Sequence, residues 1–585
     1  MKIKNFWLAL VPAFFLFISC KENAPKKPNV LLILTDDQGW GDMRSHGNEQ
    51  IDTPVLDQLA ADGAEFEHFY VSPLCAPTRA SLLTGRYHLK TGTTSVSNGL
   101  EIMDTEETTL AELFKANGYE TGIFGKWHNG SHFPNRPTDQ GFDEFIGFCA
   151  GHWSNYFDTK LDSGITEIQT KGFITDVLTD KAIDFIDRKK DDPFFCYVPY
   201  NAPHSPFQVP DAYFDKYKAR GLDDQLAAIY GMVENVDDNI KRLLDKLDKE
   251  GLTENTIVIF MTDNGPNGVR YNGHMKGIKG HVDEGGVHVP SVIKWPGKIE
   301  KGKKIKSLAA HIDWYPTLQS LCGLQPVEGR PIDGINLADW IFYYEPTESE
   351  RQIFTHVAFL EKELKDRPGA IRTDRYRFVL KEEPELYNMQ EDPTQLTNLA
   401  EKNPDLTTAM LSVYQDWFTD ASKNFQPVKP VFVHTDFVEL PTYEAQFSGN
   451  LQYEEGHGWA HDWLKNWTSS NDEMNWLIES DEPVEMKAYL KYSVSEEQLG
   501  STITLAVGGE ETEARVEKAF DPAIIPSPDR VPRKEAYEKN WAEMELGTLV
   551  IPEGKNKISL RAKNIKHTEV AEVKSLILRQ KHPTK

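Results

Sequence analysis

The chain has 585 residues, a formal net charge of −26 at pH 7 and the composition of an ordinary soluble protein. This length predicts two or three domains. The negative charge argues against a nucleic-acid-binding protein, whose affinity rests on basic surface, but it is compatible with a local basic pocket for an anionic substrate. The cysteines are widely spaced without a CxxC pair, which predicts neither a disulfide framework nor a zinc site: Cys20, Cys75, Cys149, Cys196 and Cys322.

The N-terminus has the features of a targeting segment. Two lysines precede an apolar run, Phe6 to Ile18, that is too short for a permanent membrane anchor and is typical of a signal peptide. The following Ser-Cys pair resembles the lipobox of bacterial lipoproteins, which implies a signal peptide over 1–20, lipidation of Cys20 and a polar tether over 21–27. Ordinary signal cleavage nearby is the alternative. The expectation is an exported lipoprotein at the outer membrane, on its periplasmic or cell-surface face, that contacts the membrane through the lipid anchor only.

Alternating strands and helices follow. Asn29 to Thr35 and Thr256 to Thr262 are continuous apolar runs, as in parallel strands covered on both faces. Further elements are expected as strands over 120–124 and 194–198 and as helices over 53–62, 108–117 and 175–189. This order predicts an α/β domain over residues 28–346 with a mostly parallel sheet, whose site lies at the carboxyl ends of the strands.

Two further regions are predicted after this domain. Strands over 370–380 and 385–389 with an amphipathic helix over 404–422 indicate a small α+β subdomain at 347–426. From 427 to 585 apolar residues alternate with polar ones, as in the run from Val484 to Tyr492, and the turns are rich in glycine. That pattern is typical of an antiparallel, jelly-roll-like β-sandwich, here an appended accessory domain.

Acidic and amide residues directly follow the two apolar strands. Asp36-Asp37 comes after the first strand and Asp263-Asn264 after the second. These side chains offer only oxygen ligands, without a cysteine or histidine cluster, which favours Ca²⁺ or Mg²⁺ over zinc. A helix cap or a turn is the alternative for each pair taken alone.

The stretch SPLCAPTRASLLTGR places a cysteine where a helix begins. Pro77 suits a first helical turn, the run from Thr78 to Leu83 can be helical, and Gly85 suits its end. Cys75 would then lie at a helix N-terminus, which attracts anions and lowers the pKa of a thiol. The alternative is a buried structural thiol.

A set of motifs in one order resembles the type I sulfatases of the alkaline phosphatase superfamily. The motifs are PNVLLILTDDQGWGD, CAPTR, TGIFGKWH, TDNGP, KGHVDEGGVHVPSVIKWPG and ELYNMQEDPTQLTNLA, which run from about residue 28 to 425. The resemblance implies an alkaline-phosphatase-like α/β/α sandwich and hydrolysis of sulfate monoesters.

The resemblance also implies a modified nucleophile. Cys75 would be converted to formylglycine (3-oxoalanine) by a formylglycine-generating or sulfatase-maturing enzyme, and Arg79 would mark the site and later hold the hydrated aldehyde. One oxygen of that hydrate is the nucleophile, held on a metal ion that is Ca²⁺ rather than Mg²⁺. The implied metal ligands are Asp36, Asp37, the modified Cys75, Asp263 and Asn264.

Four further residues carry catalytic roles by the same resemblance. Lys126 and Lys279 would neutralise the sulfate group, His204 would protonate the leaving oxygen, and His128 would take the second proton of the hydrate. Each could instead be an ordinary surface or core residue, and Lys276 competes with Lys279 for the second lysine role.

The substrate is the least determined part. His311, His152 and Trp153 are the predicted substrate contacts, and further aromatic and basic residues in loops could rim the pocket: His46, His132, Arg136 and Tyr156. They favour a sulfated polysaccharide or its oligosaccharides, with algal ulvan, carrageenan and fucoidan and host glycosaminoglycans all open.

The role of three tryptophans in the accessory region stays open, and so do two other classes of function for the whole protein. Trp459, Trp463 and Trp467 are four residues apart, so they could share one face of a short helix and either pack internally or stack on sugars. The alternatives to a sulfatase are a phosphate mono- or diesterase of the same superfamily and an inactive lipoprotein that binds sulfated glycans.

Overall fold

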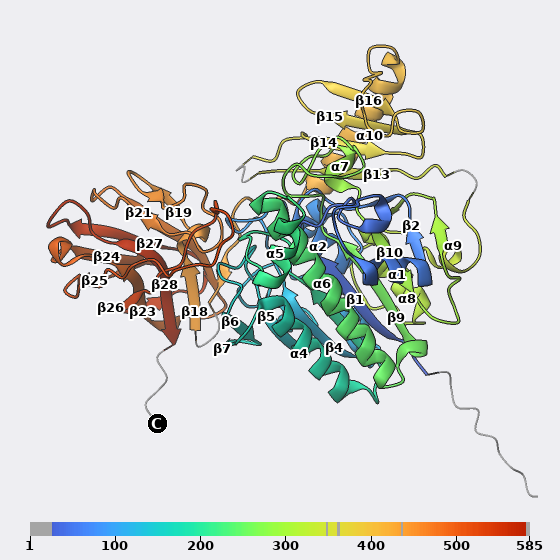
Figure 1. Ribbon diagram of the computed structural model, residues 1–585. Coiled ribbons are helices and arrows are strands. Elements are labelled where there is room, and N and C mark those ends of the chain that lie inside the picture. The colour runs from blue at the N-terminus through green and yellow to red at the C-terminus, as the bar shows by residue number, and fades with distance from the viewer. Residues whose placement is uncertain (1–25, 347–348, 360–362, 434–436, 581–585) are drawn as a thin grey trace, which may run out of the picture.

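The computed structural model describes residues 26–346, 349–359, 363–433 and 437–580, which form three parts, each with its own sheet system (Figure 1). The signal peptide, Cys20 and most of the tether lie outside the described residues. Within them, no helix has the length and apolar character needed to cross a membrane.

A ten-stranded sheet forms the centre of the largest part. Its strands in spatial order are β11 (Lys303–Ile305), β2 (Ala64–Phe66), β10 (Ser291–Lys294), β9 (Thr256–Thr262), β1 (Asn29–Thr35), β8 (Phe194–Pro199), β4 (Glu120–Lys126), β5 (Glu144–Phe148), β6 (Lys160–Ser163) and β7 (Thr166–Gln169). From β9 to β5 all neighbours are parallel, whereas β10, β6 and β7 pair antiparallel. The prediction of a mostly parallel sheet is confirmed.

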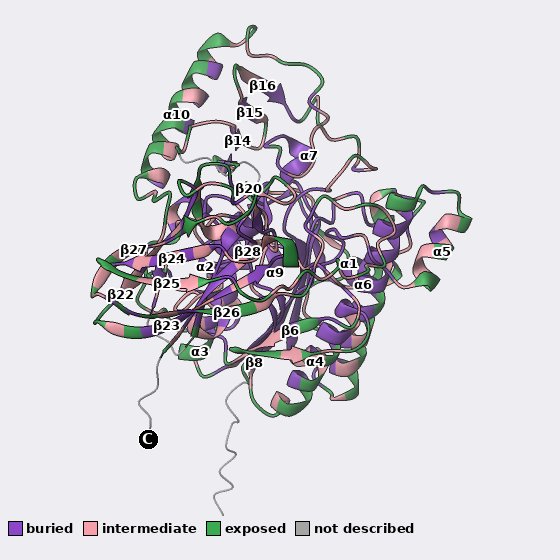
Figure 2. Cartoon of the chain, turned by 90° about the vertical axis from the view of Figure 1, so that its left-hand side faces the viewer, coloured by how far each residue is buried: buried purple, intermediate pink, exposed green. Residues whose placement is uncertain are grey.

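Helices cover both faces of this sheet, because its central strands are apolar on both sides. Leu32 and Leu34 of β1 pack with α2 (Cys75–Thr84), α3 (Leu110–Ala116) and α8 (Trp314–Leu321). Leu31 and Ile33 face the opposite side, toward α1 (Pro54–Asp62), α4 (Ile174–Lys189) and α6 (Asp224–Lys249). Figure 2 shows the sheet as the buried centre of this layered arrangement. The predicted α/β/α sandwich is confirmed.

Shorter elements complete this part. They are β3 (Phe69–Tyr70) paired with β12 (Ala309–Ala310), and helices α5 (Asp211–Ala219), α7 (Glu284–Val287) and α9 (Ala338–Phe342).

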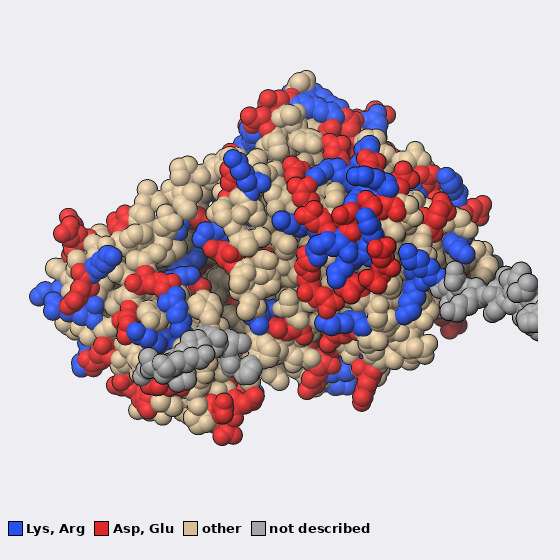
Figure 3. Space-filling view, turned by 90° about the horizontal axis from the view of Figure 1, so that it is seen from below, with Lys and Arg blue, Asp and Glu red and all other residues tan. Residues whose placement is uncertain are grey.

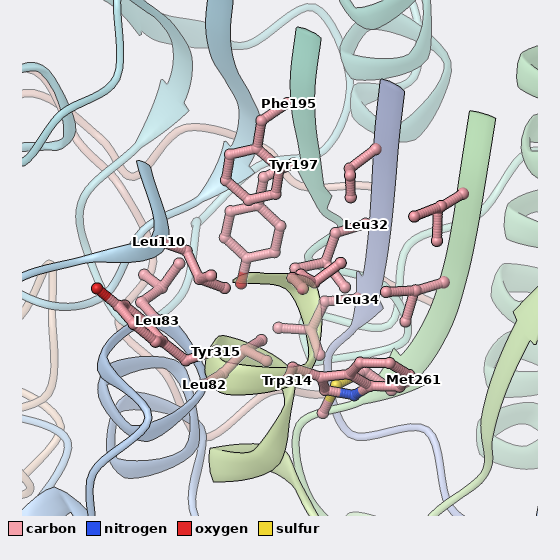
Figure 4. Close-up of a cluster of buried hydrophobic side chains, with 14 of the residues drawn as sticks. Leu32, Leu34, Leu82, Leu83, Leu110, Phe195, Tyr197, Met261, Trp314 and Tyr315 are labelled. Atoms are coloured by element: carbon pink, nitrogen blue, oxygen red, sulfur yellow. The ribbon is translucent and has the colours of Figure 1, made fainter. Parts of the chain in front are cut away.

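Helix α2 is held on the sheet by an apolar cluster (Figure 4). Leu82 and Leu83 of the helix pack toward Leu32 and Leu34 of β1, and Trp314 closes the cluster from α8. Gly85 ends the helix in the left-handed region, with φ of 69°, as the sequence predicts. The cluster fixes the position of the helix, and with it the position of Cys75 at its first turn.

Truncating this anchor should destabilise the catalytic part. Leu82 is completely buried, so Leu82→Ala should cost about 2–5 kcal/mol through lost transfer energy and the cavity left behind. The matched control Leu396→Ala removes a side chain that is 84% exposed and should cost less than about 0.5 kcal/mol. Urea unfolding followed by near-UV circular dichroism measures both. Equal midpoints for the two variants would show that α2 is not held by this cluster.

The second part is a four-stranded antiparallel sheet with one long helix. Its strands are β13 (Ile353–His356), β14 (Gly369–Arg372), β15 (Tyr376–Leu380) and β16 (Pro384–Asn388), and α10 (Pro404–Ser422) packs on them. The single strand expected over 370–380 is wrong, because β14 and β15 form a hairpin. Its turn contains neither glycine nor proline, and the hydroxyl of Thr373, which accepts from the amide of Tyr376 at 3.0 Å, stabilises it.

The third part is a β-sandwich, as predicted. One sheet holds β17 (Val431–Phe432), β22 (Glu473–Ser480), β27 (Gly554–Asn564), β24 (Thr502–Val507) and β25 (Glu510–Arg515), with β19 (Gln446–Ser448) beside β22. The other holds β20 (Gln452–Tyr453), β21 (Leu464–Lys465), β28 (Glu572–Gln580), β23 (Val484–Ser493) and β26 (Ala542–Ile551), with β18 (Phe437–Pro441) beside β28. Inward-facing apolar residues of both sheets form one core.

The helix considered for the three tryptophans does not form. The backbone enters the left-handed region at His461 and Asn466, and β21 lies between these two residues. Trp463 and Trp467 are buried, which agrees with the packing interpretation for them. The domain boundaries 346/347 and 426/427 stay predictions.

Acidic and basic side chains are interspersed over the face of the molecule seen in Figure 3. Many exposed ones form ion pairs, such as Arg188 with Glu144 at 2.7 Å and Lys241 with Asp245 at 2.6 Å. Exposed pairs of this kind contribute only about 0–1 kcal/mol each, so the apolar cores carry the stability of the fold.

Candidate active site

The two acidic strand ends lie side by side. Thr35 of β1 and Thr262 of β9 are partners in the parallel register, so the residues that follow them are adjacent. The amide of Asp263 donates to the carbonyl of Thr35 at 3.1 Å, and the amide of Asp37 donates to the Asp263 carboxylate at 3.2 Å. Asp37 has a φ of 66°, a left-handed conformation that an aspartate tolerates better than most residues. The predicted clustering at the sheet edge is therefore present.

Oxygen atoms in this cluster are arranged for a cation. The Oδ1 of Asp36, the Oδ2 of Asp37 and the Oδ1 of Asn264 are buried and have no hydrogen-bond partner among the described residues. One ligand atom each of Asp36, Cys75 and Asp263 lies within 4.8 Å of the others, and so do those of Asp36, Asp37 and His204. Unpaired buried acceptors are costly, and a hard cation would satisfy them. The residues present therefore fit the predicted Ca²⁺ or Mg²⁺.

Three basic side chains surround the carboxylates. Arg79 donates to Asp263 at 2.8 Å and to the backbone carbonyl of Lys126 at 2.8 Å. Lys126 contacts Asp36 at 2.5 Å, and Lys279 contacts Asp37 at 2.6 Å. Burial would raise the pKa of Asp37, but Lys279 holds it well below its ordinary value.

One carboxylate is not fully compensated. Burial and then the neighbouring Asp36 raise the pKa of Asp263, against the effect of Arg79. The three carboxylates and the three basic side chains balance in formal charge. Some of the carboxylate oxygens nevertheless have no hydrogen-bond partner among the described residues. An additional positive charge at this point would favour the ionised form of Asp263.

Cys75 is the first residue of α2 and is 2% exposed. The expected lowering of its pKa is wrong: burial raises the pKa of this thiol and outweighs the lowering by Lys126 and Lys279. The helix N-terminus does not compensate, because Asp36 and Asp263 add negative charge beside the sulfur. An unmodified thiol at this position would therefore be a poor nucleophile near neutral pH.

The two predicted histidines have defined proton positions. The Nε2 of His128 lies 2.9 Å from the carbonyl of Val96, so it must carry the proton and donate it. This leaves Nδ1 as a buried acceptor without a hydrogen-bond partner in the described part of the chain. Burial and then Lys126 lower the pKa of His128 well below its ordinary value, so this ring is neutral. The Nδ1 of His204 lies 2.6 Å from the carbonyl of Ser205 and donates to it. Its Nε2, 3.7 Å from Asp37, is the atom left to exchange a proton.

These groups surround a cavity of about 260 Å³. Cys75, His128, His204 and Lys279 line it, and so does His152, whose contact with a substrate stays a prediction. Arg79 and Lys126 are completely buried, and the contacts given above hold them against the carboxylates. Lys276 contacts Glu385 and Tyr387 instead, at 3.1 and 2.8 Å, so Lys279 and not Lys276 takes the second lysine position.

Two predicted substrate contacts lie elsewhere. His311 is 3% exposed, and its ring nitrogens lie 3.1 Å from the carbonyl of Tyr70 and 3.3 Å from the hydroxyl of Ser72, so it is committed to the core. Trp153 stacks on Phe148 and lines a separate cavity of about 360 Å³ between the catalytic part and the sandwich.

The other rim candidates also have different partners. His132 pairs with Glu444 at 2.8 Å and Arg136 with Asp139 at 2.8 Å, both beside the second cavity. His46 pairs with Glu65 at 2.7 Å. Tyr156 is buried, and its hydroxyl donates to the carbonyls of His204 and Ser205 at 2.9 and 3.0 Å, which supports the loop that carries His204.

Part of the cavity wall was not predicted from the sequence. Asn267, Phe359 and Glu535 line the cavity, and so does Trp459, for which the sequence left two interpretations open. Asn267 follows the second acidic pair closely and could have been found from that spacing. Phe359 and Glu535 carry no local signal, because only long-range contacts bring their segments to the site.

Comparisons with known proteins identify the family. The model described as Sulfatase matches residues 28–324, and the model described as N-sulphoglucosamine sulphohydrolase, C-terminal, matches residues 278–414. The chain is 34% identical over 352 residues to N-acetylgalactosamine-6-sulfatase of Mus musculus, which covers 54% of this chain and 66% of that protein. It is 31% identical over 388 residues to the uncharacterized sulfatase YdeN of Escherichia coli (strain K12), covering 56% and 68%. These matches span about two thirds of the relatives' length.

A solved structure shares the fold of this chain, at a level of sequence identity similar to that of the relatives above. Ps i-CgsB in complex with k-i-k-neocarrahexaose superposes with a TM-score of 0.63 at 30% identity, covering 68% of this chain and 95% of that chain. Because the Sulfatase model covers half of the sequence, and Cys75, His128 and Lys279 from three of the motifs line one cavity, the chain belongs to the sulfatase family of the alkaline phosphatase superfamily.

Proposed function

We propose that this protein hydrolyses sulfate monoesters on sulfated polysaccharides or their oligosaccharides. The observation that carries the proposal is the convergence of Cys75, Lys279, His128 and His204 on one cavity above a buried oxygen cluster. The relative N-acetylgalactosamine-6-sulfatase and the carbohydrate complex of Ps i-CgsB support a sulfated carbohydrate as the substrate class.

The proposal includes conversion of Cys75 to formylglycine by a maturing enzyme. The raised pKa of its thiol supports this step, because unmodified sulfur in this environment is weakly nucleophilic. The modified residue would supply an oxygen nucleophile. Asp36, Asp37, Asp263 and Asn264 would hold a divalent cation, with Ca²⁺ favoured, and the cation would stabilise negative charge on the sulfate oxygens.

The chain's own residues then have distinct tasks. Lys279 reaches the cavity and would bind a sulfate oxygen. Lys126, predicted for the same role, is instead buried against Asp36, and together with Arg79 it would neutralise the carboxylates beneath the cavity. His204 would donate a proton from Nε2 to the leaving oxygen of the sugar, with Nδ1 fixed by the Ser205 carbonyl. The neutral His128 presents an unprotonated Nδ1 that can accept a proton near Cys75.

The predicted export stays part of the proposal. The N-terminal segment supports a lipoprotein anchored through Cys20 at the outer membrane, where a polysaccharide-degrading enzyme would meet its substrate.

An assay with matched esters separates this activity from that of a phosphatase. Protein from a host that makes formylglycine is given p-nitrophenyl sulfate, p-nitrophenyl phosphate and bis-p-nitrophenyl phosphate, and then a panel of sulfated oligosaccharides. We expect sulfate esters to be hydrolysed with kcat/KM at least about 100-fold above that of the phosphate esters. Preference for a phosphate ester would make the protein a phosphatase, and sugar binding without any turnover would indicate an inactive binding protein.

Lys279 and Lys276 provide a matched pair of variants. Lys279→Ala should lower kcat/KM for sulfate esters about 100-fold, the cost of removing one donor aimed at the reacting group. Lys276→Ala should change it by less than about threefold, because that lysine contacts Glu385 and Tyr387 outside the cavity. Steady-state kinetics on both variants decides, and equal losses would show that the assignment of Lys279 to the sulfate is wrong.

A further inference from the structure

A segment of the accessory sandwich is hydrogen-bonded to the loop that carries His204. This segment, residues 527–535, lies in the long connection between β25 and β26. The amide of Arg530 donates to the carbonyl of Phe207 at 2.9 Å, and Gln208 donates to both Ser527 and Asp529 at 2.8 Å.

A second set of contacts fixes the same segment. Arg533 is bound within it by Asp529 at 2.6 Å, and it donates to the carbonyl of Ser154 at 2.6 Å. The segment is therefore held on two loops of the catalytic part, 154–156 and 204–209.

The end of this segment forms part of the catalytic cavity wall. Glu535 lines the cavity and is only 7% exposed. The hydroxyl of Ser205 donates to its carboxylate, and Ser205 directly follows His204. Since His204 would protonate the leaving oxygen, Glu535 lies on the side of the cavity where the sugar would leave. Lys279 also lines the cavity, but its positive charge is paired with Asp37, one of the proposed metal ligands.

A flat ring from the same part of the chain also lines the cavity. Trp459 lines the cavity and is stacked on His457, with the ring centroids 4.4 Å apart and the planes 14° from parallel. Such a ring offers an apolar face to a sugar, and the carboxylate of Glu535 offers acceptors to its hydroxyls. Ser205 occupies one acceptor site of the carboxylate, which leaves others for a ligand.

We propose that Glu535 is a specificity-determining residue, which selects a sugar with a free hydroxyl beside the cleaved sulfate and rejects one with a second sulfate or a carboxylate there. The inference rests on the proposed function and deepens it. A hydroxyl would donate to Glu535, whereas a second anion beside this buried carboxylate would be repelled. The accessory sandwich thus builds the leaving-group side of the active site.

Competition against a small substrate tests this selection without knowing the natural glycan. Hydrolysis of p-nitrophenyl sulfate by the full-length protein is inhibited with two matched pairs. These are N-acetylgalactosamine monosulfate against the corresponding disulfate, and kappa- against iota-carrageenan oligosaccharides, which carry one and two sulfates per disaccharide. We expect wild-type protein to bind the monosulfated member at least about 10-fold more tightly. Glu535→Gln keeps a polar partner for Ser205 and should reduce that ratio to about one.

Glu538→Gln is the control, because it removes a nearby negative charge from a side chain that is 40% exposed and does not line the cavity. It should leave the ratio unchanged. Three results would overturn the inference. They are an equal ratio of affinities in wild type and Glu535→Gln, a wild-type preference for the disulfated member, and no inhibition by either pair. If Glu535→Gln does not fold, the wild-type ratio alone decides. Turnover of p-nitrophenyl sulfate by wild-type protein tests the proposed function separately.

Discussion

Cys75→Ala should lower kcat/KM for sulfate esters at least about 1,000-fold, because alanine cannot be converted to the aldehyde whose hydrate supplies the nucleophilic oxygen. The rest of the site would stay in place, since α2 is held by its apolar cluster and Cys75 itself packs only at the first turn. Cys75→Ala protein should therefore still bind sulfated oligosaccharides. Initial rates with p-nitrophenyl sulfate, together with calorimetric binding of a sulfated oligosaccharide, measure the two effects.

Cys322→Ala is the matched control. Cys322 is a buried free thiol, 7% exposed, that ends α8 in the apolar cluster and does not line the cavity. Its truncation should lower stability but leave the activity of folded molecules within about twofold of wild type. Cys75→Ala protein that kept more than a tenth of wild-type activity would exclude covalent chemistry at this residue.

Removal of divalent cations should have the second-largest effect. Asp36, Asp37 and Asp263 repel one another in a buried site, so a chelator should lower both activity and stability. We expect hydrolysis to fall at least about 100-fold after dialysis against EDTA. The thermal midpoint should fall as well, because saturating cation at 100 times its Kd contributes about 2.7 kcal/mol of stability.

Reconstitution identifies the cation. Ca²⁺ should restore activity and midpoint together, and Mg²⁺ should restore less, because it demands a stricter geometry and gives up its water reluctantly. Asp37→Asn should show little response of its midpoint to either ion, since it weakens one ligand and the pairing with Lys279. Full activity and an unchanged midpoint in EDTA would contradict a metal site at this cluster.

The sequence was sufficient where local pattern and packing agree. Residues 29–35 and 256–262 are apolar without alternation because both of their faces are buried, and each forms a strand with these bounds. The acidic residues after them converge because parallel neighbours end at the same edge, with Thr35 opposite Thr262. Helix α10 likewise begins and ends as its amphipathic pattern predicts.

The predictions that were wrong or missing share one physical cause, which is that long-range contacts determine these residues. The pKa of Cys75 depends on burial and on carboxylates from two strands, which override the helix N-terminus visible in the local sequence. His311 is placed by Tyr70 and Ser72, more than 200 positions away, and no local feature shows that its nitrogens are already bonded. Glu535 reaches the cavity through contacts with a loop about 330 positions earlier. Residues of this kind can be assigned only once the fold is known.

The most direct test is peptide mass spectrometry across Cys75, on protein purified from a host that converts a control sulfatase. We expect an aldehyde or its hydrate at Cys75, and across preparations the rate of sulfate release should rise in proportion to the fraction of molecules that carry it. An unmodified thiol at Cys75 in protein that nevertheless hydrolyses sulfate esters, or complete conversion in protein that releases no sulfate from any ester, would contradict it.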